Sequence, residues 1–105
     1  MSLRGTPTVV DSGTLMIDGV VVHLDGVKGG PGEPAHELFR YIAGREDACE
    51  PAASGVPHYR CKVGTYDLGE AVLLNGAAQA AADAPERLRS AEEKARAAHR
   101  GIWRQ

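Results

Sequence analysis

The stretch TVVDSGTLMIDGVVVHL, residues 8–24, decides the fold class of this chain. Runs of β-branched and other apolar residues alternate in it with two turn signals. Asp18-Gly19 between apolar runs is a strong signal for a two-residue hairpin. Asp11-Ser12-Gly13 is typical of a second tight turn. Two tight turns so close together predict three adjacent antiparallel strands.

A glycine-rich loop, residues 28–33, follows these strands. We expect it to be a flexible connector, because the Gly-Lys-Ser/Thr sequence of a phosphate-binding loop is absent. Pro34 then suits the first position of a helix that Gly44 ends. The apolar residues that would share one face of this helix are Ala35, Leu38, Phe39 and Ile42. Residues 46–63 are predicted to form two further strands around a turn.

Two more helices are predicted in the second half of the chain. Asp67 and Glu70 fit a capping box, so a short helix is expected to begin there and to end at Asn75-Gly76. The last helix should begin near Pro85 and end at Gly101. Its apolar stripe would consist of Leu88, Ala91, Ala95, Ala98 and Ile102. Ile102-Trp103 are expected to pack back onto the core.

This order of elements favours an α+β, mainly β fold. Three strands, a helix, two strands and two helices fit a five-stranded OB-fold-type β-barrel with about three helices. A length of 105 residues suits one domain. We place that domain at residues 8–103, between an N-terminal tail, 1–7, and a C-terminal tail, 104–105.

Cys49 and Cys61 are the only cysteines. The segment between them is rich in turn residues, and an even separation in a hairpin places two side chains on one face. We therefore expect a disulfide and, with it, an exported location, periplasmic or extracellular. The chain shows no secretory leader, so this expectation depends on the cysteines alone. The alternative is two buried, reduced cysteines. No second ligand pair stands at zinc-site spacing.

The charge balance argues against a polyanion as the main partner. The formal net charge is −2, whereas phosphate-binding proteins usually carry a basic excess. No apolar run is long enough to span a bilayer. The charged last helix is interpreted as a solvated face; the alternative is a polyanion site made by Arg87, Arg89, Lys94, Arg96 and Arg100. Tyr41, Tyr59 and Tyr66 are interpreted as packing anchors, with base or sugar stacking as the alternative.

Four motifs together resemble one known family. Residues 9–15 (VVDSGTL), residues 21–27 (VVHLDGV), Asp67-Leu68 and the ending Gly101-Ile102-Trp103 occur in the order and spacing of the staphylococcal-nuclease-like (thermonuclease) family. The resemblance covers roughly residues 8–103 and implies the OB-type barrel. It also implies a chemistry: calcium bound by carboxylates, a glutamate that activates water, and two arginines that stabilise the phosphoryl charge.

Nearly every catalytic position of that family holds another residue in this chain. The positions of the two metal-binding aspartates and of the two arginines are occupied by Gly13, Lys28, His23 and Val56, in that order. Asp11 matches the family's turn-forming aspartate. The glutamate position falls on Pro31 without gaps, and Glu33 approximates it only with a two-residue insertion. Because each such group supplies about 10²–10³ in rate, their joint loss removes the mechanism.

The leading hypothesis is therefore a catalytically inactive nuclease-like domain, a pseudoenzyme that serves as a binding module and needs no cofactor. Some bacterial members of the family are associated with exopolysaccharide (succinoglycan) production, which the resemblance extends to this chain. Protein or polysaccharide partners are favoured, and nucleic acid is an alternative. The candidate residues for a binding groove are Asp11, His23, Asp25, Lys28, Glu33, Tyr59 and Arg60.

Three other hypotheses stay open. The first is a residual or altered calcium-dependent phosphodiesterase acting on nucleic acid. The second is a structural domain of a larger polypeptide. The third is a new site in place of the old one: a transition-metal site, or hydrolase chemistry at Ser54, which lacks a nucleophile elbow. The candidate metal ligands are His23, Asp25, Glu33 and His36, and the candidate bases for Ser54 are His58 and His36.

Overall fold

The predicted meander is present in the structure, a computed structural model that describes residues 2–104. Its strands are β2 (Thr8–Asp11), β3 (Thr14–Ile17) and β4 (Val20–Leu24), paired antiparallel in sequence order. Asp18 and Gly19 both have positive φ, at 51° and 77°, as the turn between two twisted strands requires. The hairpin prediction at this pair is confirmed.

The strands of the main sheet follow the spatial order β1-β6-β7-β4-β3-β2. The added strands are β1 (Leu3–Gly5), β6 (Asp47–Pro51), β7 (His58–Val63) and β8 (Tyr66–Asp67), which pairs with β7. The pair β4 and β7 is parallel, and the other pairs are antiparallel. Two short strands, β5 (Val27–Lys28) and β9 (Gln79–Ala80), pair separately. The fold is α+β with a mixed, mainly antiparallel sheet.

Strand β1 extends the sheet into the segment that was expected to be a tail. Leu3 is the register partner of Cys49 and Gly5 that of Asp47, and Leu3 packs against the core. Pairing with β1 satisfies backbone groups of β6 that an edge strand would leave open. In residues 2–104 the pairings leave β1 and β2 at the two ends of the sheet, so they do not close a barrel.

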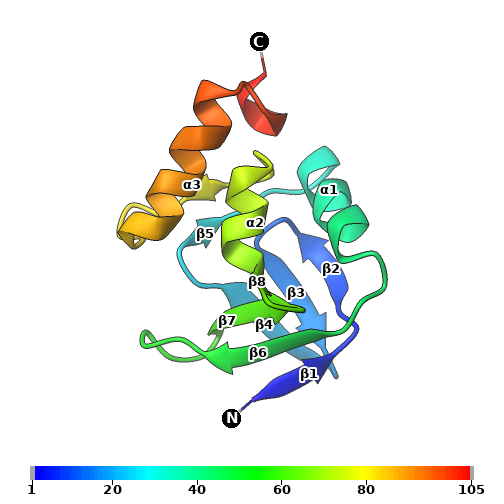
Figure 1. Ribbon diagram of the computed structural model, residues 1–105. Coiled ribbons are helices and arrows are strands. Elements are labelled where there is room, and N and C mark those ends of the chain that lie inside the picture. Colours follow the sequence, from blue (N-terminus) through cyan, green and yellow to red (C-terminus); the bar gives the residue numbers. More distant parts are fainter. Residues whose placement is uncertain (1, 105) are drawn as a thin grey trace.

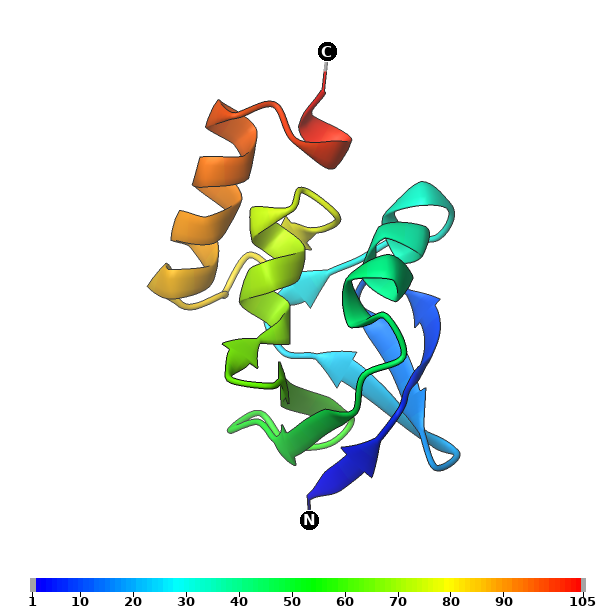
Figure 2. The ribbon, with the colours of Figure 1, turned by 45° about the vertical axis from the view of Figure 1, so that its right-hand side comes forward.

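The helices lie together on one side of the sheet, with α2 between α1 and α3 (Figures 1 and 2). They are α1 (Glu33–Ile42), α2 (Leu68–Leu74) and α3 (Glu86–Ala97), followed by the 3₁₀ turn η1 (Gly101–Trp103). The predicted start of α2 is confirmed, because the Glu70 N–H donates to the Asp67 carboxylate at 2.9 Å. Pro34 was expected at the first position of α1 and is its second residue, because the helix begins at Glu33.

Two details of the helices differ from the prediction. On α1, Leu38 and Ile42 are buried, but Phe39 is 60% exposed, because only a narrow stripe of the helix faces the sheet. The helix α3 ends at Ala97, before Gly101. The Ile102 N–H donates to the Gly76 carbonyl at 2.8 Å, but the Ile102 side chain is 40% exposed and Trp103 is only half-buried, so the predicted packing onto the core is incomplete.

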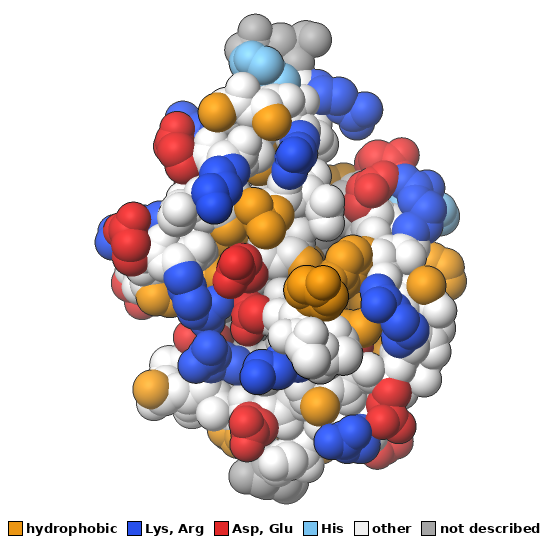
Figure 3. All heavy atoms as spheres, in the orientation of Figure 1, with side chains coloured by type: hydrophobic (Ala, Val, Ile, Leu, Met, Phe, Trp, Pro, Cys, Tyr) orange, Lys and Arg blue, Asp and Glu red, His pale blue; other side chains and the backbone are white. Residues whose placement is uncertain are grey.

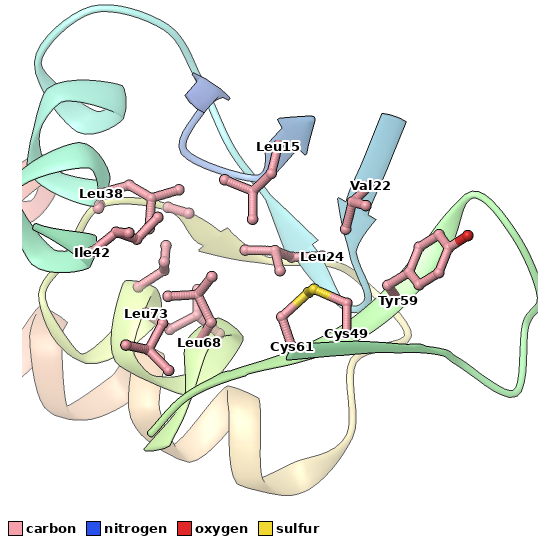
Figure 4. Close-up of a cluster of buried hydrophobic side chains, with 14 of the residues drawn as sticks. Leu15, Val22, Leu24, Leu38, Ile42, Cys49, Tyr59, Cys61, Leu68 and Leu73 are labelled. Atoms are coloured by element: carbon pink, nitrogen blue, oxygen red, sulfur yellow. A yellow bond between two sulfur atoms is a disulfide. The ribbon is translucent and has the colours of Figure 1, made fainter. Parts of the chain in front are cut away.

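The predicted disulfide between Cys49 and Cys61 is confirmed. The two residues are register partners on β6 and β7, and each is 1% exposed. The bond lies inside the main cluster of buried side chains, beside Leu24 and close to Leu68 (Figure 4). The disulfide therefore joins two central strands from within the core.

Candidate functional site

The turn at Ser12-Gly13 is held against the glycine-rich loop by paired hydrogen bonds. The Ser12 N–H donates to the Gly30 carbonyl at 3.0 Å, and the Gly30 N–H donates to the Ser12 hydroxyl at 2.9 Å. Within the turn, the Gly13 N–H donates to the Asp11 carboxylate at 2.8 Å. Asp11 thus acts as the turn former that the sequence indicated. The loop is fixed to the turn at Gly30 and does not leave it as a free connector.

No side chain fits at the contact between this turn and the loop. A Cβ atom added to Gly13 would lie 2.9 Å from the Gly29 backbone nitrogen, and one added to Gly29 would lie 2.1 Å from the Gly13 nitrogen. Cβ atoms do not approach backbone so closely without a shift of one of the two segments. Position 13 therefore has no room for an aspartate while the loop keeps this place.

A hollow of about 440 Å³ opens beside the carboxyl end of β4. Its polar lining comes from His23, Asp25, Ser54, His58 and Asp83. We call it the β4–β7 hollow, because the parallel pairing makes His23 and His58 register partners. Their ring centroids are 6.0 Å apart. In the part of the chain that the structure describes, no Lys or Arg lines this hollow.

Three hydrogen bonds orient the polar groups of the hollow. The Ser54 hydroxyl donates to Asp25 Oδ1 at 3.0 Å, and the Asp25 N–H donates to the Tyr59 carbonyl at 2.9 Å. Thr14 Oγ1 and His23 Nδ1 are hydrogen-bonded at 3.1 Å. The second Asp25 oxygen and the far nitrogen of His23 are thereby left for a ligand.

In the structure the groove candidates other than Asp11 are divided among several hollows. His23 and Asp25 share the β4–β7 hollow, but Lys28 lines a separate hollow with Gly29 and Gly30. Arg60 is exposed on β7 and borders a hollow against β1 and β6. It also lines a hollow of only about 10 Å³ with Asp25 and Tyr59. Tyr59 is 3% exposed and belongs to the buried cluster (Figure 4), so it does not present its ring to a ligand.

Val56 and Glu33, the other two positions that the resemblance assigns, also lie outside the β4–β7 hollow. Val56 is 66% exposed and stands just before a cis Pro57. Glu33 begins α1 and lies 3.5 Å from Arg40, beside a different cleft that includes Arg100. Neither residue lines the β4–β7 hollow with His23 and Asp25.

The residues of the alternative metal site and of the alternative hydrolase site are not assembled either. His36 and Glu33 are on α1, whereas His23 and Asp25 are on and just after β4. Among residues 2–104, no three His, Cys, Asp or Glu side chains gather closely enough to hold a metal ion. Ser54 and His58 share the hollow, but the Ser54 hydroxyl is donated to Asp25, so it is not paired with an imidazole as a nucleophile would be.

Two acidic residues, Asp47 and Asp83, were not predicted as candidate site residues from the sequence. Asp47 is 0% exposed, and neither carboxylate oxygen has a hydrogen-bond partner within residues 2–104. Burial raises its pKa from 3.8 to about 7, and the nearby positive charge of Arg45 opposes this rise. Asp83, which lines the hollow, was also missed. Neither residue belongs to a motif, so no local signal could have identified them.

Positive and negative side chains are mixed on the surface. Lys and Arg side chains are interspersed with Asp and Glu on the face shown in Figure 3, and several are paired, such as Arg87 with Asp67 at 3.0 Å. In residues 2–104, no helix has the length and apolar character needed to cross a membrane.

Comparison with known proteins does not identify a family for this chain. No protein-family model matches this chain, and no curated protein is found as a relative.

Proposed function

We propose that this chain is a catalytically inactive, nuclease-like domain that serves as a binding module. Its partners would be a protein or a polysaccharide, and the resemblance to the thermonuclease family favours a link to exopolysaccharide production of the succinoglycan type. The proposal rests on what has replaced the catalytic groups at the positions that the resemblance assigns.

The contact between Gly13 and Gly29 carries the proposal. In the family, the position of Gly13 holds a metal-binding aspartate. In this chain a side chain there would meet the Gly29 backbone at 2.9 Å. Lys28 stands at the second aspartate position and would repel a cation. A calcium site thus lacks both its ligands and its space.

The surroundings of His23 support the same view. This position would hold the first catalytic arginine, and the hollow around it is lined by Asp25 and Asp83 and by no Lys or Arg in the described chain. Imidazole lacks the fork of donors by which arginine binds phosphate. A phosphodiester would meet carboxylates there, with no cation to stabilise its charge.

The strand order supports the OB-type barrel that the proposal assumes. The two ends of the sheet, β1 and β2, are consecutive in the chain and are separated only by Thr6-Pro7. The chain itself therefore links the two ends of the sheet, although β1 and β2 are not paired with each other. OB-type barrels are partly open and bind oligonucleotides or oligosaccharides on one face, which suits a binding role.

The proposed exported location rests on the disulfide. A Cys49–Cys61 bond is compatible with an oxidising compartment. Within the described residues the chain has no free cysteine, so no reactive thiol would need a reducing environment.

Restoring the family residues tests the proposal. We expect the triple variant Gly13→Asp, His23→Arg, Lys28→Asp to remain unable to cut a labelled oligonucleotide with calcium, because the turn has no room for Asp at position 13. Gly13→Ala alone should lower the free energy of unfolding by about 1–3 kcal/mol, the usual cost of overpacking. Denaturation in urea measures it.

The control is the double variant His23→Arg, Lys28→Asp, which leaves Gly13 in place and should fold as the wild type does. Calcium-dependent cutting by the triple variant would contradict the proposed closure of the site. Equal stability of Gly13→Ala and the wild type would contradict the steric argument.

A further inference from the structure

The β4–β7 hollow has a charge unlike that of other hollows on the surface. Two carboxylates, Asp25 and Asp83, line it, and no Lys or Arg among the described residues lines it. Arg60 and Arg87 line a small adjoining hollow of about 10 Å³ that shares Asp25. By contrast, the hollow against β1 and β6 includes Arg60 and Lys62. The cleft beside α1 includes Arg100 and Arg104. The lining of the β4–β7 hollow itself therefore carries carboxylates without a cation among the described residues.

The acceptors of the hollow are arranged before any ligand arrives. Asp25 is half-buried, and its Oδ1 is held by the Ser54 hydroxyl at 3.0 Å, which leaves Oδ2 free to accept. Thr14 holds His23 through Nδ1 at 3.1 Å. Groups that are fixed in place lose little freedom on binding, so more of the interaction energy remains for the ligand.

The hollow also offers space and an apolar wall. Its volume of about 440 Å³ lies within the range of small-molecule sites, roughly 300–1,000 Å³. Val27 and Pro57 line it beside the polar groups and can contact the carbon skeleton of a ligand. A charged head group with a short carbon stem or ring matches this lining.

We propose that the β4–β7 hollow binds a primary ammonium group, held by Asp25 and Asp83, with Ser54 and the two imidazoles as further polar contacts. An ammonium group donates three hydrogen bonds and accepts none, which suits a set of carboxylate acceptors. Such a group is carried by an amino sugar or by a lysine side chain. This inference rests on the proposed binding function and names the chemistry that the module recognises.

A titration followed by NMR tests the proposal, and acetylation of the ligand's amine provides the uncharged control. ¹⁵N-labelled protein is titrated with glucosamine and with Nα-acetyl-lysinamide. Each is compared with the form in which the amine is acetylated, which removes the positive charge. We expect both amines to shift the amide signals of residues 23–27, 54–56 and 58, and both acetylated forms to leave them in place. The stronger of the two amines identifies the source of the ammonium group.

Variants locate the binding. Asp25→Asn and Asp83→Asn should each weaken amine binding about tenfold, as expected for the loss of a charged hydrogen-bond partner. The matched control is Asp18→Asn, at the exposed turn between β3 and β4, which should bind as the wild type does. Far-ultraviolet circular dichroism checks that each variant is folded.

Equal shifts with the amines and their acetylated forms would overturn the inference, as would amine binding that survives both aspartate substitutions. Shifts of the same residues by inorganic phosphate would also overturn it, because they would show an anion site. None of these outcomes depends on nuclease activity. If the amines fail to bind while the chain still does not cut DNA, this inference fails and the proposed function stands.

Discussion

The free energy of unfolding should fall as the pH rises from about 4 to about 7, because the Asp47 carboxyl holds its proton in the folded protein up to about pH 7 but releases it near 3.8 when unfolded. Between these values the native state binds more protons, so stability decreases with pH. One pKa unit corresponds to about 1.4 kcal/mol, so the full loss is about 4 kcal/mol. This is a large part of the stability of a small domain.

Urea denaturation of the wild type and of Asp47→Asn across this pH range measures the effect. The amide cannot ionise, so the free energy of unfolding of the variant should vary little with pH between pH 4 and 7. At pH 7.5 the variant should be more stable than the wild type. Asp18→Asn, at an exposed turn, is the control and should keep the wild-type slope. Equal slopes in the wild type and Asp47→Asn would show that the carboxyl is hydrated or paired in solution.

The double variant Cys49→Ala, Cys61→Ala should lose more than about 3 kcal/mol of stability, and more than the wild type loses when its disulfide is reduced. The disulfide closes a loop with a sequence separation of 12, and the lost loop-closure entropy accounts for about that amount. Because both sulfurs lie in the core, the smaller alanine side chains add a packing cost.

Three samples separate these two terms in urea denaturation: the oxidised wild type, the wild type with its disulfide reduced, and the double alanine variant. The reduced wild type keeps both sulfur atoms, so its loss reports the loop term alone. Identical midpoints for the oxidised and reduced wild type would contradict the assignment of the bond as a stabilising cross-link.

Features that depend on neighbouring residues were predictable from the sequence. The Asp18-Gly19 turn needs two residues that tolerate positive φ, and the Asp67 cap needs one side chain three positions before Glu70. Both signals are local, and both elements are present. The disulfide was predictable for a similar reason, since a short hairpin brings Cys49 and Cys61 into register.

Features that depend on distant segments were not predictable. The parallel pairing of His23 with His58 joins parts of the chain far apart in the sequence and builds the β4–β7 hollow. The Gly13–Gly29 contact also arises from tertiary packing, because glycines alone fit many loops. The burial of Asp47 runs against the usual preference of aspartate for the surface, so no composition rule could have indicated it.

The most direct measurement is the fluorescence anisotropy of a labelled single-stranded oligonucleotide mixed with the wild-type protein, with calcium or with a chelator, over time. We expect no calcium-dependent change in the size of the oligonucleotide, because Gly29 leaves no room for a side chain at Gly13, where the resemblance to the thermonuclease family would place a metal-binding aspartate. A fall in anisotropy that requires calcium would mean that the chain cuts phosphodiesters, and it would contradict the central claim.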